Sequence, residues 1–72
     1  MHENILISFG KRVKQHRIDR GWSQEKLAEK TGFHRTYIGM IERGERNIGL
    51  KNIEVFASVF RVNLSDLLDI ED

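Results

Sequence analysis

The sequence contains no cysteine and no proline, and its longest unbroken apolar run has three residues. Without cysteine no disulfide can stabilise the fold, and this absence fits a reducing cytoplasm. Such short apolar runs exclude a membrane-spanning helix. The N-terminus has neither the basic nor the apolar region of a secretory signal peptide, so we expect a cytoplasmic protein that does not contact a membrane.

The chain is also short, because 72 residues suffice for one domain and no more. We therefore expect a single domain over residues 1–72. A domain of this size buries barely enough apolar surface to be stable alone, so a dimer is expected.

The formal net charge of +1 hides an uneven distribution. Residues 1–61 carry all 12 basic residues and seven acidic ones, a net charge of +5, whereas residues 62–72 carry four acidic residues and no basic one. A charge run of this kind is often only a solvated surface. The other interpretation is that the basic part faces a polyanion and the acidic end points away from it.

Apolar spacing and capping residues predict an all-α fold. Leu6, Phe9 and Val13 recur every three or four positions, as on one face of a helix. Ser23 and Ser65 are good N-caps for the second and fifth helices. The expected helices cover residues 4–20, 24–30, 35–43, 50–60 and 65–69. No segment alternates with period two for long enough to predict a strand, so we expect a compact five-helix bundle.

The fourth of these helices has two apolar faces. One broad face is expected to fill the core, and a second stripe is formed by Val55 and Val59, one turn apart. A second stripe on so small a protein needs a partner. We expect the fourth and fifth helices to form a homodimer interface from Val55, Val59, Val62, Leu64, Leu67 and Leu68. The alternative is that the fifth helix folds back and covers Val55 and Val59 within one subunit.

The second and third helices are separated by a very short turn, from Gly32 to His34. This is the arrangement of a helix-turn-helix, whose second helix enters the major groove of DNA. Ala28 is small where two helices would cross, and Gly32 allows the left-handed backbone of the turn. Ile38 and Ile41 would fill the angle between the helices. An ordinary helical hairpin could show the same spacing.

The outward side of the third helix strengthens the prediction of DNA binding. It has no acidic residue before Glu42, unlike most solvated helices. Arg35 can bind guanine through two hydrogen bonds, and the methyl group of Thr36 can contact thymine. Tyr37 can stack or bind a phosphate. The expected DNA-binding residues are Gln24, His34, Arg35, Thr36, Tyr37, Met40, Arg43, Arg46 and Asn47.

The segment from Arg17 to Leu68 resembles the Cro/Xre-type helix-turn-helix domains of phage repressors and small bacterial regulators. Within it, the stretch SQEKLAEKTGFHRTYIGMIERGERN is most similar to the controller proteins of restriction–modification systems. The resemblance implies a lambda-repressor-like fold and a two-fold dimer that binds operator DNA near a promoter. It also implies base contacts by Arg35, Thr36 and Tyr37, and phosphate or base-edge contacts by Gln24, Arg43, Arg46 and Asn47.

Gly39 departs from the pattern, because such regulators often carry serine or a larger polar residue at this position. The missing side chain removes one potential DNA contact. The resemblance therefore does not determine the operator sequence. Arg17 extends the apolar series of the first helix, and Glu42 lies one turn after Ile38. We therefore expect a structural Arg17–Glu42 ion pair, which the resemblance also implies.

Nothing in the sequence indicates catalysis. His2, His16 and His34 are scattered and lack metal-ligand spacing, and no catalytic elbow accompanies Ser, His and Asp. We expect no cofactor, no metal and no enzymatic activity. Trp22 is expected to pack against the core or its turn.

The leading hypothesis is a homodimeric transcriptional regulator, the controller of a restriction–modification system. Its expected partners are double-stranded DNA with a roughly palindromic operator and a second copy of the chain, with RNA polymerase as a further candidate. A phage-type repressor or an antitoxin on the same fold is the first alternative. A protein-interaction module that has lost DNA binding is the second.

Overall fold

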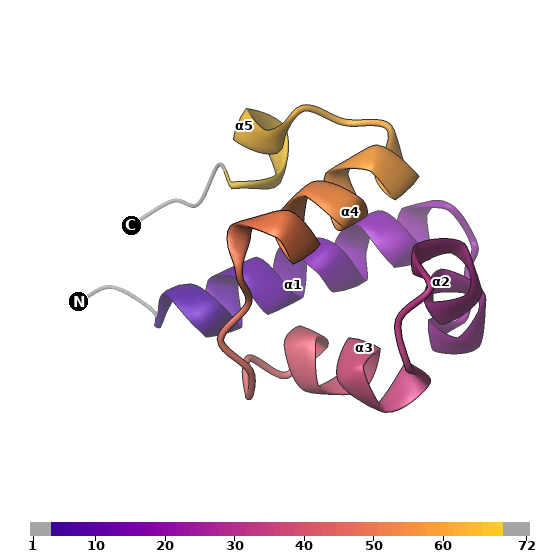
Figure 1. Ribbon diagram of the computed structural model, residues 1–72, viewed down its shortest axis with the longest axis horizontal. Helices are drawn as coiled ribbons and strands as arrows, with labels where there is room; N and C mark the ends of the chain where they lie inside the picture. The colour runs from indigo at the N-terminus through magenta and orange to yellow at the C-terminus, as the bar shows by residue number, and fades with distance from the viewer. Residues whose placement is uncertain (1–3, 69–72) are drawn as a thin grey trace.

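A computed structural model describes residues 4–68, and this part of the chain contains five α-helices and no strand. The helices are α1 (Ile5–Asp19), α2 (Gln24–Thr31), α3 (Arg35–Glu42), α4 (Leu50–Phe60) and α5 (Leu64–Leu67) (Figure 1). The predicted all-α, five-helix fold is confirmed. The end predicted for the fifth helix, at residue 69, and the acidic residues after it lie outside the described residues. No helix within residues 4–68 is long and apolar enough to cross a membrane.

Local capping explains where the helices begin and end. The side chain of Ser23 accepts a hydrogen bond from the backbone N–H of Lys26 at 3.0 Å, as an N-cap of α2 should. The prediction of Ser65 as the cap of the fifth helix is wrong, because α5 begins after Asn63. The backbone N–H of Asn63 donates to Asp66 Oδ2 at 3.3 Å, and this pairing of N-cap and third helical residue fixes the earlier start.

The core is centred on the inner side of α4, which crosses α1 (Figure 1). Phe56 is fully buried and lies edge-on to Phe9, with ring centroids 6.4 Å apart. Phe60 stacks on Trp22 at 6.1 Å with the rings 17° from parallel, so Trp22 packs against the core as predicted. Leu67 closes the core from α5 and is fully buried. Aromatic pairs of this kind add to the stabilisation from buried area.

Two glycines bring α1 into backbone contact with the end of α3. A Cβ atom on Gly10 would lie only 2.3 Å from the carbonyl oxygen of Ile41, so no larger residue fits there. A Cβ atom on Gly44 would lie 2.7 Å from the Cα of Ile7, and Gly44 also has a φ of +72°. This close approach fixes α3 against the longest helix of the domain.

Candidate nucleic-acid interface

Helices α2 and α3 form a helix-turn-helix whose turn is built as the sequence predicts. Gly32 adopts the left-handed conformation, with a φ of +79°. The hydroxyl of Thr31 accepts a hydrogen bond from the backbone N–H of Phe33 at 3.2 Å and so tightens the turn. Ile38 and Ile41 are buried between the helices. Helix α3 lies along one side of the molecule and α5 along the opposite side (Figure 1).

The outer face of α3 is polar and open to solvent. His34, Arg35, Thr36 and Arg43 are exposed, while Met40 is half-buried. His34 makes no side-chain cap, so its ring does not occupy the backbone N–H groups of the first turn. These exposed donors lie on the helix that a helix-turn-helix places in the major groove.

The arginines of this face are each held by a carboxylate from a neighbouring segment. Arg35 Nε lies 3.4 Å from Glu25 on α2, and Arg43 Nε lies 3.0 Å from Glu45 in the loop after α3. The hydrogen bond that Arg43 donates to Glu45 raises the pKa of the Arg43 guanidinium. Because all four side chains are more than half exposed, these contacts are weak and open to competition from phosphates or base edges. Both acidic partners lie outside α3, so the periodicity of that helix could not reveal them.

Gly39 is buried beneath Arg43 rather than left open as a gap in the interface. A Cβ atom on Gly39 would lie 3.0 Å from Arg43 Nη1. The missing side chain therefore makes room for the guanidinium of Arg43. The sequence predicted the loss of a contact here but not this use of the space.

Tyr37 lies at the edge of the outer face instead of on it. Its ring packs edge-on against Phe33, with centroids 5.1 Å apart, and belongs to the partly buried layer around the core. Its hydroxyl accepts a hydrogen bond from Asn52 Nδ2 at 3.0 Å. The guanidinium of Arg46 lies 5.6 Å from the ring centroid, and Asn47 beside it is exposed. Periodicity on α3 alone did not reveal the bond to Asn52, which comes from α4.

Arg17 and Glu42 form the ion pair that the sequence predicted, on the inner side of α3. Arg17 donates from Nε to Glu42 Oε2 at 2.7 Å and from Nη2 to Oε1 at 3.1 Å. A third nitrogen of Arg17 donates to the carbonyl oxygen of Trp22 at 2.8 Å. Gln24 Nε2 donates to Glu42 Oε1 at 3.1 Å, so one of its two amide hydrogens is used within the protein. This network joins α1, α2 and α3.

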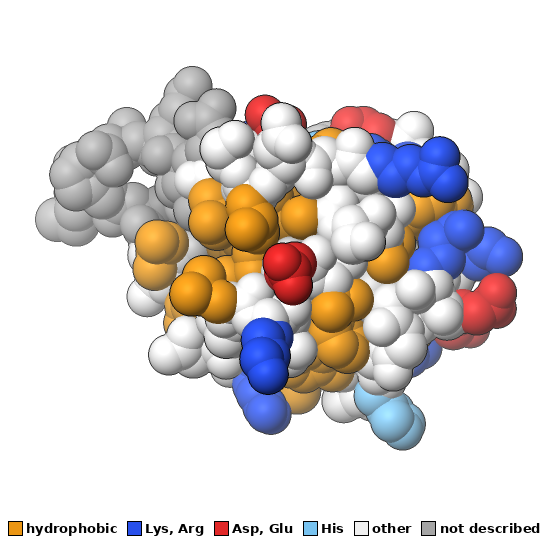
Figure 2. All heavy atoms as spheres, turned by 45° about the horizontal axis from the view of Figure 1, so that its top comes forward, with side chains coloured by type: hydrophobic (Ala, Val, Ile, Leu, Met, Phe, Trp, Pro, Cys, Tyr) orange, Lys and Arg blue, Asp and Glu red, His pale blue; other side chains and the backbone are white. Residues whose placement is uncertain are grey.

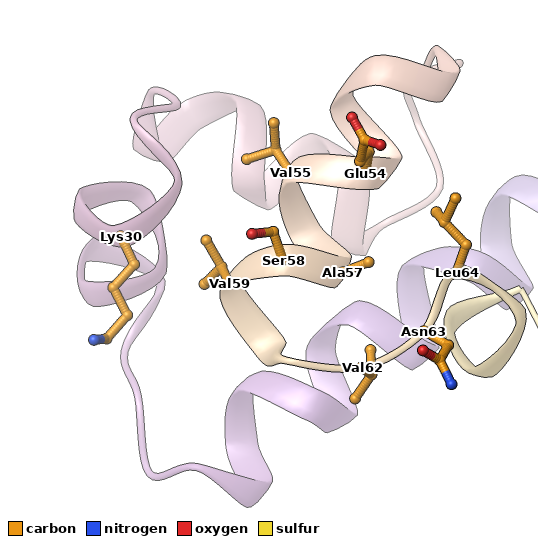
Figure 3. Close-up of a pocket in the computed structure, with 9 residues that line it drawn as sticks. All are labelled: Lys30, Glu54, Val55, Ala57, Ser58, Val59, Val62, Asn63 and Leu64. Carbon is orange, nitrogen blue, oxygen red and sulfur yellow. The ribbon is translucent and has the colours of Figure 1, made fainter.

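On the opposite side, α4 and α5 leave a groove between them (Figure 3). Val55 and Val59 line it from α4, and Val62 and Leu64 line its other side. The groove is open, so α5 does not cover the two valines as the alternative prediction required. Hydrophobic side chains gather on this side of the molecule (Figure 2), where Leu64 in the groove is 39% exposed. Leu68 is also 39% exposed, but it lines a separate hollow with Ile5 and Leu6 of α1.

The assignment of Leu67 to a dimer interface is wrong. Its side chain has no exposed surface in the single chain, because it points into the core between α5 and α4. The apolar spacing of so short a helix did not distinguish its inner residue from its outer ones. Among residues 4–68, no group of three or more His, Asp or Glu side chains could hold a metal ion.

The fold and the short turn between α2 and α3 are those of a helix-turn-helix protein, and comparison with known proteins agrees. The model of the helix-turn-helix family matches residues 13–67, and the chain belongs to this family. Within it, the chain is similar to control protein C.BamHI of Bacillus amyloliquefaciens, with 49% identity over 70 residues that cover 96% of this chain and 86% of that protein.

Two solved structures extend the similarity to three dimensions. The restriction–modification controller protein C.AhdI from Aeromonas hydrophila has a TM-score of 0.82 and 40% identity, covering 86% of this chain and 94% of that one. The controller protein C.Esp1396I, solved as a tetramer in complex with its natural 35 base-pair operator, has a TM-score of 0.82 and 31% identity. That match covers 94% of this chain and 93% of the other.

Proposed function

We propose that this chain is a sequence-specific DNA-binding transcriptional regulator that binds operator DNA as a homodimer and controls a restriction–modification system. The observation that carries the proposal is the outer face of α3, whose exposed Arg35, Thr36 and Arg43 stand on the second helix of a helix-turn-helix. The similarity to C.BamHI and C.AhdI supports the more specific role as a controller.

In the proposed complex, each subunit places α3 in the major groove of one half-site. Arg35 would bind guanine and Thr36 would contact thymine near the N-terminal end of the helix. Arg43, Arg46 and Asn47 would bind the sugar–phosphate backbone, which fixes the register of the helix on the duplex. Glu25 and Glu45 would release their arginines as DNA takes their place.

The second copy of the chain would cover the groove between α4 and α5. Val55, Val59 and Leu64 supply an apolar surface there, and α5 lies on the side of the molecule opposite to α3 (Figure 1). A two-fold dimer formed through this surface leaves both α3 helices free for DNA. It also implies an operator with two inverted half-sites whose centres lie about 34 Å or a multiple of this apart.

A DNA-binding role fits a cytoplasmic location, and it involves no catalysis and no cofactor. RNA polymerase remains a candidate partner at the promoter.

Selection from a pool of random-sequence duplexes tests the proposal even though the operator sequence is open. We expect the selected DNA to contain an inverted repeat, and titration of one repeat to saturate at two chains or a multiple of two. If each subunit contacts about three to five phosphates, the affinity falls steeply with salt, by about 0.9 logarithmic units per phosphate for each tenfold rise.

A pool that shows no enrichment, or an affinity that does not change with salt, would contradict the proposal and favour a protein-interaction module. Restriction and methyltransferase genes beside this gene would support the controller role, whereas a neighbouring toxin gene would indicate an antitoxin.

A further inference from the structure

Tyr37 is held on two sides by residues that belong to different segments. Its ring meets Phe33 at an interplanar angle of 75°, and its hydroxyl is 3.0 Å from Asn52 Nδ2 in the first turn of α4. Tyr37 and Asn52 are both half-buried, so neither side chain is free to swing in solvent. The position of the hydroxyl is therefore set by α4 as much as by α3.

The direction of this hydrogen bond determines which further hydrogen bond the hydroxyl can form. A tyrosine hydroxyl has one hydrogen to donate and two lone pairs that accept. Because Asn52 donates to it, the bond occupies a lone pair and leaves the hydrogen unused. Within residues 4–68, the hydroxyl of Tyr37 donates no hydrogen bond. A hydroxyl that already accepts one hydrogen bond is also polarised toward donating another.

A second donor lies near the ring that carries this hydroxyl. The guanidinium of Arg46 lies over the ring of Tyr37, 5.6 Å from its centroid, and the residue is exposed. A hydroxyl hydrogen and a long exposed guanidinium that packs on the same ring can both reach the oxygens of one phosphate group, and guanidinium–phosphate hydrogen bonds are strong. The placement of Tyr37 at the edge of the outer face of α3 also suits the DNA backbone better than a base.

We infer that Asn52 is a positioning residue of the DNA interface, which holds the Tyr37 hydroxyl so that its hydrogen, together with Arg46, binds a DNA phosphate. The inference rests on the proposed function and adds to it a residue that does not itself contact DNA. It also assigns Tyr37 to the DNA backbone, whereas the family resemblance assigns it to the bases.

A double-mutant cycle tests this coupling. Dissociation constants are measured for the selected operator and for a duplex with altered half-sites, using the parent chain, Tyr37→Phe, Asn52→Ala and the double variant. We expect each single variant to weaken binding to both duplexes by a similar factor of about two to ten, the size of one hydrogen bond. The double variant should bind as the Tyr37→Phe variant does, because Asn52 acts only through the hydroxyl.

Asn52→Asp reverses the hydrogen bond and sharpens the test. A carboxylate only accepts, so it would draw the hydroxyl hydrogen away from DNA. The added negative charge also repels DNA, and this contribution is measured separately by placing Asn52→Asp in the Tyr37→Phe background. We expect a larger loss of affinity with the tyrosine present than with phenylalanine in its place. Thermal melting of each variant shows how far the fold itself is affected.

The outcomes separate the inference from the function on which it rests. If the parent binds the operator but the effects of Asn52→Ala and Tyr37→Phe simply add, Asn52 acts through the stability of α4 and the inference is overturned. The same holds if Tyr37→Phe weakens binding to the operator alone, because the hydroxyl then reads a base. If the parent selects no DNA, both the proposed function and the inference fail.

Discussion

The two faces of α3 carry the same chemical pairing in different surroundings. On the inner face, the side chains of Arg17 and Glu42 are only 12% and 3% exposed and share two hydrogen bonds. On the outer face, the side chains of Arg35 and Glu25 are 61% and 74% exposed and meet at 3.4 Å. A buried pair must stay intact because either partner alone would be a buried charge. An exposed pair contributes little to stability, and its arginine can therefore bind another anion.

The largest effect that follows from this difference is on stability. Arg17→Ala leaves Glu42 buried without its main partner, so we expect the free energy of unfolding to fall by about 3–5 kcal/mol. Chemical denaturation followed by circular dichroism measures it. Arg35→Ala is the matched control, because it removes an arginine of an exposed pair and should change stability by less than about 0.5 kcal/mol. Equal stability of the two variants would remove the distinction between the faces.

A smaller effect, on binding instead of stability, is expected for the outer face. Arg35→Ala should weaken binding to the selected operator by about 1–3 kcal/mol and relax the preference at one base position. Fluorescence anisotropy on the operator and on single-base variants measures both quantities. Arg61→Gln is the control, because it removes an exposed charge at the end of α4, outside the outer face of α3. If Arg61→Gln reduced affinity equally and with no change in base preference, net charge alone would account for binding.

The smallest expected effect is a pH dependence of stability from His16, a residue outside α3. It tests whether burial changes the behaviour of a charged group there as it does at Arg17 and Glu42. His16 stacks on Phe60 at 5.1 Å, and its pKa is lowered from 6.5 by burial and then by Arg20 and Arg12, against smaller opposing effects of Asp19 and Asp66. Below about pH 6.5 the unfolded chain therefore takes up this proton more readily than the folded one. We expect a slight decrease in the melting temperature as the pH falls through this range, reduced in His16→Gln. An identical pH dependence in both proteins would contradict this expectation.

Features set by local sequence were predictable. The helix ends at Ser23 and Gly32 follow from capping and left-handed backbone, which act over a few residues. The burial of Ile38 and Ile41 follows from helical periodicity, which also places Arg17 and Glu42 on the inner sides of their own helices, while the family resemblance added that the two would pair. The exposed residues of α3 were found by the same reasoning, because the residues opposite a buried stripe must face outward.

Contacts between distant segments were not predictable in this way. Nothing near Gly10 in the sequence shows that the carbonyl of Ile41 will lie where its side chain would be. Asn52 reaches Tyr37 only because the folded chain brings the first turn of α4 near the first turn of α3. Leu67 and Leu68 are adjacent in the chain, yet one is buried and the other exposed. Each outcome depends on how two elements pack, and one helix alone does not define it.

The contact at Gly10 has a consequence for how DNA sequences are discriminated. Because Gly10 of α1 meets the backbone at the C-terminal end of α3 directly, that end of α3 cannot move closer to the longest helix of the domain. The side chains of α3 are thus presented from a fixed frame, and little backbone freedom is lost when the protein docks. On this basis we expect small shifts of α3 to accommodate a mismatched base pair poorly. The free-energy penalty of a mismatch then falls on the side chains and the DNA. We expect this to sharpen the discrimination between DNA sequences.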